Sequence, residues 1–552
     1  MCLAFSIAPL VNRFLLSAIL AIGAVSGAWA QQPAPAAADP AARFAAAVTA
    51  TELRRHLTEL ASDAYQGRET GQPGQRKAAE YLARQFTGLG LRGPVTGSSN
   101  PYWQSFELVK TTPSGYASIS INGRYFDQLR DFIGFGATPF TTPTAADPVF
   151  LGFGIETERY NDYAAQPDVR GKDVLVLQGE PTDGRGRYLL SGSTKESPWG
   201  SGYRKAALAR DKGARSVTVI TFAGTVQFEA MGAGVAEQLA EPTFALAAPV
   251  HQPQDERTLA ETPPEGINLY ITSFDLGLAL LGSNAEALQN YVLGSYSTGK
   301  PPKPLQPVPF TFSIPQKQET ITSENVLGFL EGTDKKDELL VISAHYDHLG
   351  VQHDTIYNGA DDDGSGTSAV LALAQAFTQA KAAGHGPRRS ILFLLNTGEE
   401  KGLLGSQYYT SHPVVPLTST VADLNIDMVG RTDSRHTTKS EYVYVIGSDR
   451  LSPELHALNE AANKRYTHLK LDYKYNEPND PEQLYTRSDH YNFARYRIPV
   501  IFYTSGLHKD YHKATDDVEH IEFDKLAQRA RLVFFTAWDL ANRPQRPAVP
   551  VK

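Results

Sequence analysis

From Phe310 onward, near-continuous apolar runs alternate with segments whose apolar residues recur at helical spacing. The apolar runs, which we expect to be strands, are ELLVISAH, RSILFLLN, VADLNIDMV, YVYVIGS and IPVIFYT. The expected helices are TSAVLALAQAFTQA, LLGSQYYTS, PELHALNEAANKRY and HIEFDKLAQRARLVFFTAWDLA. Apolar strands that alternate with helices are typical of a parallel sheet covered on both faces. The pattern therefore predicts an α/β fold with a mostly parallel central sheet flanked by helices.

Two other patterns precede this region. The segment from Phe44 to Leu91 has helical spacing of apolar residues and a turn-rich loop, QGRETGQPG, at its centre. Residues 113–305 instead contain short β-rich pieces joined by Gly/Pro-rich connections, and the boundary GKPPKPLQPVP follows them. A chain of 552 residues is also too long for one ordinary hydrophobic core. We therefore expect a second, mixed β/α domain over residues 113–305.

The two ends of the chain have compositions that do not support a core. Arg13 is the only charged residue before an apolar run from Phe14 to Gly27, and Ala28-Trp29-Ala30 fits a cleavage site. The run is shorter than the ~20 apolar residues of a membrane-spanning helix. We expect a signal peptide over residues 1–30, a Pro/Ala linker over 31–42 and a disordered tail over 546–552. The mature protein is then exported, periplasmic or secreted, without stable membrane insertion.

The composition of the chain excludes several classes of partner and of catalytic group. The formal charge of −8 argues against nucleic acid as a partner, because nucleic acid selects a basic face. Cys2 is the single cysteine and lies within the predicted signal peptide. The mature chain would therefore have no thiol chemistry, and any metal would be held by histidine and carboxylate side chains. The sequence also lacks a G-x-S-x-G elbow, an H-E-x-x-H helix and a P-loop.

Titratable residues gather where the expected strands end. His345 and Asp347 follow ELLVISA, Glu399-Glu400 follows RSILFLLNTG, and Asp427 ends VADLNI. A loop after IPVIFYT contains His508, Tyr511 and His512, and Asp361-Asp362-Asp363 precedes an expected helix. Each of these taken alone has a simple structural explanation, such as a helix cap or a pair of surface acids. Together they lie at the sheet edge where α/β proteins bind ligands.

These residue types suit a pair of zinc ions. Two ions ~3.5–4 Å apart need one bridging carboxylate, plus one histidine and one carboxylate each. Asp361 would bridge the two ions. His345 and Asp427 would complete one site, and Glu400 with His512 the other. The remaining position on each ion would be a shared water or hydroxide.

Two more acids have roles in this scheme. Adjacent side chains of an extended segment point in opposite directions, so Glu399 can face the water while Glu400 binds metal. Glu399 would then be the general base. Asp347, two residues after His345, would hold the second nitrogen of that imidazole.

The motifs resemble those of the aminopeptidase Y / glutamate carboxypeptidase family of di-zinc exopeptidases. The matching segments are AHYDHLG, NGADDDGSG, NTGEEKGLLGSQ, LNIDMVG, DYHKATDDVEHI, SDHYNF and the upstream QGRETGQPG. The resemblance implies the same ligand set, two Zn²⁺ per chain and a cis peptide bond between Asp361 and Asp362. It also implies that Tyr511 is the oxyanion donor and that Asp489 and His490 are supporting residues.

The middle region is similar, less specifically, to the protease-associated domain that this family carries as an insertion. The resemblance implies a discontinuous peptidase domain, formed by residues 43–112 and 306–545, with the inserted domain limiting access to short or unfolded peptides. A structural appendage without a role at the site is the alternative.

We expect an aminopeptidase that acts on peptide substrates. Three alternatives stay open: a carboxypeptidase of the same family, which would grip a substrate carboxylate through an arginine such as Arg204 or Arg487; a glutaminyl cyclase; and a non-catalytic binding or receptor protein on a peptidase fold. The complete ligand set argues against the last two.

Overall fold

The computed structural model describes residues 39–135, 140–183, 185–248, 250, 253, 266–478 and 480–550. The predicted signal peptide and most of the predicted linker lie outside these residues. The last part of the linker is helical, because α1 begins at Pro40 and buries Phe44. None of the helices in the described residues is long and apolar enough to cross a membrane.

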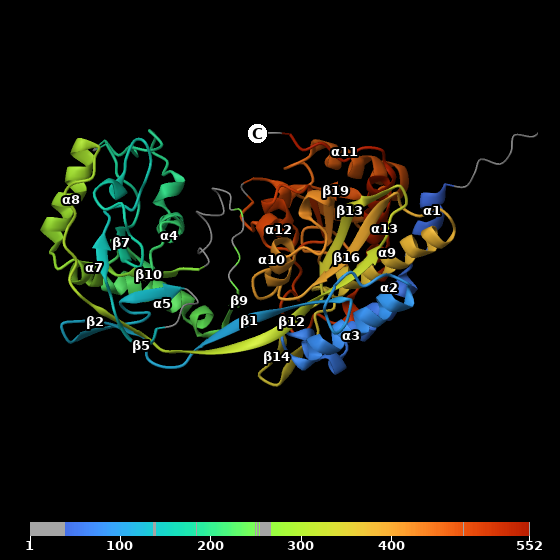
Figure 1. Cartoon of the computed structure of the whole chain (residues 1–552), viewed down its shortest axis with the longest axis horizontal. Coiled ribbons are helices and arrows are strands. Elements are labelled where there is room, and N and C mark those ends of the chain that lie inside the picture. The colour runs from blue at the N-terminus through green and yellow to red at the C-terminus, as the bar shows by residue number, and fades with distance from the viewer. Residues whose placement is uncertain are drawn as a thin grey trace, which may run out of the picture. The chain divides into compact units, whose positions relative to one another are not determined.

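Within the described residues, a nine-stranded mixed sheet forms the main body (Figure 1). In sheet order its strands are β19 (Lys470–Asp472), β18 (Tyr442–Ile446), β20 (Val500–Thr504), β17 (Thr420–Ile426), β13 (Lys335–His345), β16 (Arg389–Asn396), β12 (Gln316–Leu330), β1 (Trp103–Pro113) and β9 (Thr243–Leu246). The central strands β20, β17, β13 and β16 are parallel, as the apolar runs predicted. The strands β12, β1 and β9 on one side pair antiparallel, and so does β18 with β20 on the other.

Helices cover both faces of this sheet, which explains why its central strands are apolar throughout. In the described residues, the helices of the main body are α1 (Pro40–Ala45), α2 (Ala50–Leu60), α3 (Pro73–Gly88), α9 (Gly364–Ala382), α10 (Leu404–Ser411), α11 (Pro453–Ala462), α12 (His490–Arg495) and α13 (Phe523–Asn542). Alternate residues of β13 enter two different cores: Leu340 and Ile342 pack with α2, α9 and α13, whereas Leu339 and Val341 pack with α10 and α12. The α/β class is confirmed.

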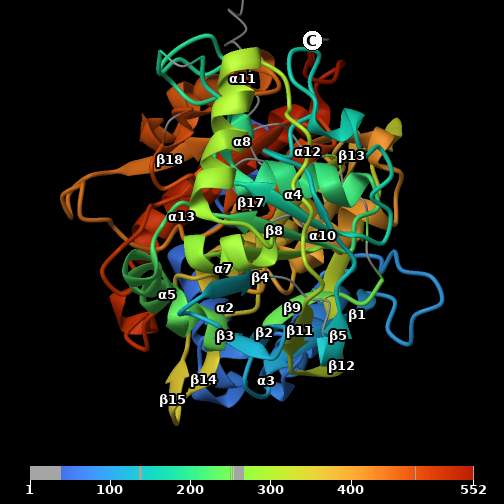
Figure 2. The same ribbon diagram turned by 90° about the vertical axis from the view of Figure 1, so that its left-hand side faces the viewer.

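The middle segment has two smaller sheets, and Figure 2 looks onto it. One contains β4 (Phe132–Phe135), β10 (Asn268–Thr272), β8 (Ser216–Ile220), β7 (Asp173–Leu177) and β6 (Pro148–Phe150); the other contains β3 (Arg124–Asp127), β2 (Ser118–Ile121), β11 (Thr311–Ile314) and β5 (Phe140–Ala145). The helices of this segment are α4 (Gly202–Asp211), α5 (Thr225–Ala240), α7 (Phe274–Leu280) and α8 (Ala285–Thr298). Tyr270 and Phe312 stack across the two sheets in a shared core.

The limits of this segment differ from the predicted 113–305. Strand β11 lies beyond residue 305 yet pairs with β2 and β5, so the small sheets extend to Ile314. Strand β9 belongs to the segment by sequence yet pairs with β1 of the main sheet. Its likeness to a protease-associated domain stays a prediction.

The C-terminal tail makes hydrogen bonds with the main body up to Pro550, and its expected disorder over 546–552 stays a prediction. Ser452 and Glu454 bind the backbone of Ala548 at 2.7 and 2.8 Å, and Arg497 donates to the carbonyl of Pro550. Residues 551–552 lie outside the described chain.

Candidate metal centre

The parallel strands bring the predicted site residues to one edge of the sheet. β13 ends at His345, β16 leads through two residues to Glu399-Glu400, and β17 ends one residue before Asp427. Because β13 pairs parallel with both β16 and β17, and β17 with β20, all these ends share an edge. The loop after β20 carries His512 to the same place.

One half of the site is centred on His345. Its Nε2 atom lies 3.2 Å from Asp362 Oδ1, 3.6 Å from Asp427 Oδ1 and 3.9 Å from Glu399 Oε2. The second oxygen of Asp427 accepts a hydrogen bond of 2.7 Å from the Ser488 hydroxyl, so Oδ1 is the oxygen left to face the histidine.

The other half is centred on His512. Its Nε2 atom lies 3.1 Å from both Asp362 Oδ2 and Glu400 Oε2. The two oxygens of Asp362 therefore face the two histidines, one each. Asp362 therefore lies between the two histidines.

The carboxylate between the two histidines is one residue further along the chain than the predicted bridge. Asp361, the predicted bridge, points away: its Oδ1 accepts a hydrogen bond of 2.6 Å from the Gly430 amide, and its Oδ2 lies 3.2 Å from His508 Nε2. The cis peptide bond joins Asp362 and Asp363 rather than Asp361 and Asp362. Asp516 fixes this register, because its carboxylate accepts from the amides of both Asp361 and Asp362.

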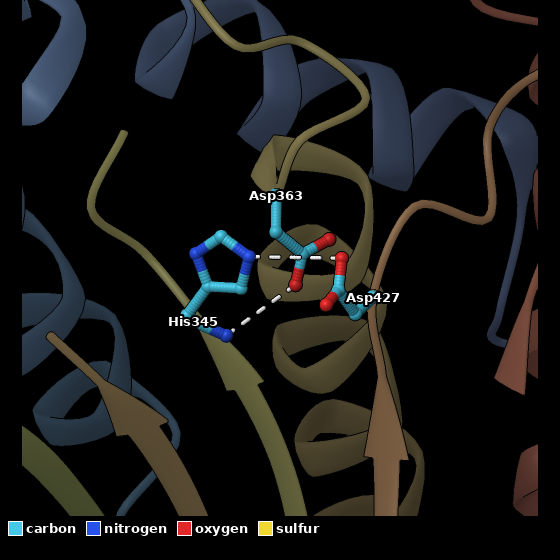
Figure 3. A group of neighbouring side chains, drawn as sticks. All are labelled: His345, Asp363 and Asp427. Atoms are coloured by element: carbon cyan, nitrogen blue, oxygen red, sulfur yellow. Dashed lines mark hydrogen bonds and ion pairs between the residues drawn. The ribbon is translucent and has the colours of Figure 1, made fainter. Parts of the chain in front are cut away.

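The third acid of this run, Asp363, has a structural role. Its Oδ1 accepts from the Gly366 amide at the start of α9 and from the Met428 amide, at 2.7 and 3.1 Å. Its Oδ2 accepts from the His345 amide at 3.3 Å (Figure 3). Asp363 thus caps α9 and joins that helix to the ends of β13 and β17.

The donor set fits divalent metal. Asp362 is 3% exposed, and its Oδ2 has no hydrogen-bond donor among the described residues. A buried, unsatisfied carboxylate oxygen that faces imidazole nitrogens is costly unless a cation is present. Ligand atoms of His345, Asp363 and Asp427 cluster within 4.8 Å, and so do those of His348, Asp362 and Glu400. Histidine and carboxylate ligands of this kind suit zinc.

The two adjacent glutamates differ in their electrostatics. For Glu400, burial and nearby Asp362 raise the pKa, but hydrogen bonds from His348 and His512 outweigh them and lower it to about 2. For Glu399, burial raises the pKa well above its usual range, and His345 opposes this only in part. Glu400 is therefore held as an anion, as a metal ligand must be, whereas Glu399 has the greater proton affinity.

Asp347 supports the site in a different way from the one predicted. The His345 Nδ1 atom lies 3.1 Å from the backbone carbonyl of Asp347 and 3.7 Å from its carboxylate, so the carbonyl accepts the hydrogen bond. The carboxylate instead accepts from Thr70 Oγ1 at 2.7 Å and from the Glu399 amide at 3.3 Å. Asp347 thereby joins the His345 loop to Glu399.

The QGRETGQPG motif holds the loops of the site in place. Arg68 is fully buried and donates to the backbone carbonyls of Leu60, Tyr346, Asn358 and Gly359 at 2.7–2.9 Å. Burial lowers its pKa, and the carboxylates of the site oppose that shift. The sequence pattern included this motif but gave it no role.

A cleft opens beside the two halves of the site. It is lined by Asp362, Glu399, Asp427, Met428, Leu484, Arg487, Phe502, Thr504, Leu507, Tyr511 and His512. Tyr511 stacks on His512. The Tyr511 hydroxyl oxygen accepts a hydrogen bond of 3.2 Å from Arg487 Nη2. Arg204 lies elsewhere, over the Trp199 ring of the middle segment.

The two residues expected to support the site are buried near it. Burial raises the pKa of Asp489 to about 7 and lowers the pKa of His490 to about 3. The His490 ring stacks on Phe502, one of the residues that line the cleft.

Residues 325–537, which contain both halves of the site, match the model of peptidase family M28. Within this segment the chain is similar to the proteins of peptidase family M28. Curated relatives include a probable leucine aminopeptidase of Trichophyton verrucosum, 30% identical over 38% of this chain and 55% of that protein. Aminopeptidase YwaD of Bacillus subtilis is 26% identical over 41% of this chain and 46% of that protein. The chain thus spans about half the length of the curated relatives it matches.

A likeness in fold extends beyond the matched segment. An aminopeptidase from Aneurinibacillus sp. strain AM-1 superposes with a TM-score of 0.50, covering 93% of this chain and 98% of that one at 18% identity. At that identity the likeness shows a shared fold.

Proposed function

We propose that the protein is an exported di-zinc aminopeptidase that releases N-terminal residues from peptides. One observation carries the proposal: the carboxylate of Asp362 lies between His345 and His512, with one oxygen 3.1–3.2 Å from each imidazole. Asp427 and Glu400 face the same two histidines from either side. The match of residues 325–537 to family M28 and the aminopeptidase names of the relatives support the same activity.

The proposed ligands are His345 and Asp427 for one ion, His512 and Glu400 for the other, and Asp362 for both. Zinc held there would polarise the scissile carbonyl and acidify a water molecule. A binding protein would not need Glu399, a largely buried acid of raised pKa in the cleft beside these ligands. We assign Glu399 as the group that takes the water's proton and then passes it to the leaving amine.

Tyr511 is positioned to donate to the substrate oxyanion. Burial and the nearby acids raise its pKa, so the phenol keeps its proton at neutral pH, as a donor must. Arg487 donates to the phenol oxygen, which leaves the hydroxyl hydrogen free to face the cleft.

Substitution Tyr511→Phe should lower kcat by about 10²–10³-fold, comparable to loss of an oxyanion donor elsewhere, and raise KM by much less. The reason is that the hydrogen bond strengthens only as negative charge develops in the transition state. Steady-state kinetics on a chromogenic amino-acid amide would measure both parameters. An unchanged kcat with a raised KM would make Tyr511 a substrate-binding residue instead.

One observation favours a second candidate, a carboxypeptidase. Arg487 lines the cleft, and its guanidinium could bind a substrate carboxylate as well as it binds Tyr511. The cleft also contains the acids Glu399 and Asp427, which suit a free amine.

The deciding experiment is metal analysis of the purified mature protein, combined with hydrolysis of matched peptides that are either free or acetylated at the amine. We expect two zinc ions per chain and cleavage of the free-amine peptides alone. Cleavage that instead requires a free C-terminal carboxylate would establish the carboxypeptidase. A protein that binds no zinc and hydrolyses none of the peptides would be a binding protein.

Export is supported by the charge and hydropathy pattern of residues 1–30. Amino-terminal sequencing of the protein from its native cell fraction tests it, since a mature chain beginning near Gln31 is expected.

A further inference from the structure

His348 is a buried histidine that has no part in the proposed ligand set. Its Nδ1 atom lies 2.8 Å from Glu400 Oε1, and the ring has no exposed surface. The ring packs against Gly359, where an added Cβ would come within 2.4 Å of it. A side chain larger than that of glycine at position 359 would therefore displace the histidine.

The contact with Glu400 has the length of a hydrogen bond. Two ligand atoms on a tetrahedral zinc with bonds of ~2.0–2.1 Å lie roughly 3.3 Å apart. The contacts of His512 with Asp362 and Glu400, both 3.1 Å, approach that spacing. The 2.8 Å contact of His348 is shorter, and its distance to Asp362 Oδ2, 3.8 Å, is too long for a hydrogen bond.

The two nitrogens of the His348 ring are used differently. An ionised carboxylate can only accept, so Nδ1 carries the hydrogen and donates it to Glu400. Nε2 has no hydrogen-bond partner among the described residues.

The opposite half of the site has the same arrangement. There Ser488 donates to Asp427 Oδ2, and Oδ1 is the oxygen that faces His345. Here His348 contacts Glu400 Oε1, and Oε2 is the oxygen that faces His512. The carboxylates of Asp427 and Glu400 thus each have one oxygen that accepts from a protein donor and a second oxygen that faces the proposed metal position.

We propose that His348 is a positioning residue that occupies Glu400 Oε1, so that Oε2 alone binds the metal shared with His512. The backbone of His348 is fixed independently, since its amide donates to the Arg68 carbonyl at 3.3 Å. This inference rests on the proposed di-zinc function. Outer donors of this kind contribute about 10–100-fold to metal affinity.

The test compares His348→Leu with His348→Asn, two side chains that have the same number of heavy atoms and the same branching at Cγ. The amide nitrogen of Asn can stand where Nδ1 stands, whereas Leu has no donor. Zinc affinity is measured by competition with a chromogenic chelator, and Glu400→Gln identifies which of the two zinc equivalents belongs to the His512 half. His353→Asn, at an exposed histidine five residues away, is the control.

We expect His348→Leu to lower the zinc affinity of the His512 half by about 10–100-fold and to leave the affinity of the other half unchanged. His348→Asn should recover most of the loss, and the cobalt-substituted spectrum should match the wild type. Equal affinities for the Leu variant and the wild type would overturn the inference. So would an Asn variant as weak as the Leu variant, because the ring would then act as a ligand or as packing.

Two controls keep these outcomes interpretable. Thermal melting of the metal-free variants shows whether they fold, and His348→Ala replaces the Leu variant if that one does not. A wild-type chain that binds no zinc would overturn the proposed function itself, whereas a wild type with two ions and no effect at His348 would overturn this inference alone.

Discussion

Substitution Glu399→Gln is expected to lower kcat by about 10²–10⁴-fold while both zinc ions stay bound. Gln has the same shape as Glu but cannot take a proton from water. Glu399 Oε2 is 3.9 Å from His345 Nε2, further than the oxygens of Asp362 and Asp427, so its loss should spare the ligand set. Metal analysis and steady-state kinetics on the same preparation would measure both effects.

The neighbouring Glu400→Gln variant is the matched contrast. Glu400 Oε2 lies 3.1 Å from His512 Nε2, and hydrogen bonds from His348 and His512 hold the side chain as an anion. A neutral amide there should release the zinc of the His512 half. If instead Glu399→Gln lost metal and Glu400→Gln kept both ions, the roles of the two residues would be exchanged.

The sequence predicted the parts of the fold that repeat a physical pattern. The strands β13, β16, β17 and β20 are apolar because both of their faces are buried, and their ends carry the titratable residues. The long strand β12 was missed because its first half is exposed and polar, so neither an apolar run nor a regular alternation marks it. Its partner β1 was missed as well, and with them the antiparallel half of the sheet.

Contacts between residues far apart in the sequence determine the features that could not be predicted from it. The contacts of the tail are with Ser452 and Glu454, which are almost a hundred residues away along the chain. The role of Arg68 depends on four carbonyls from three separate segments. None of these contacts leaves a local pattern of spacing or charge.

The run Asp361-Asp362-Asp363 shows the same limit within the site. The three residues are chemically identical, so composition and spacing predict a bridging aspartate without identifying which one it is. Asp516, more than 150 residues further on, sets the register by accepting from the amides of Asp361 and Asp362. The structure then places Asp362 between His345 and His512. Asp361 accepts a hydrogen bond from the Gly430 amide, and Asp363 caps the start of α9.

This register leads to the second large effect. Substitution Asp362→Asn should abolish the binding of both zinc ions at stoichiometric concentrations, and activity with it. A bridging carboxylate supplies one anionic oxygen to each ion, whereas the amide of Asn is neutral and has a single oxygen. The loss should exceed the ~10–100-fold that removal of an outer partner costs. Zinc content after gel filtration, and chelator competition for the residual affinity, would measure it.

Asp361→Asn is the control that separates the two assignments. Asp361 accepts from the Gly430 amide through one oxygen, which Asn retains, and the other oxygen lies 3.2 Å from His508 rather than beside His345 or His512. This variant should therefore keep two zinc ions, with any loss seen mainly in thermal stability. If Asp361→Asn emptied the site while Asp362→Asn remained loaded, Asp361 would be the bridge after all, and the side chains of this loop would have to exchange positions when metal binds.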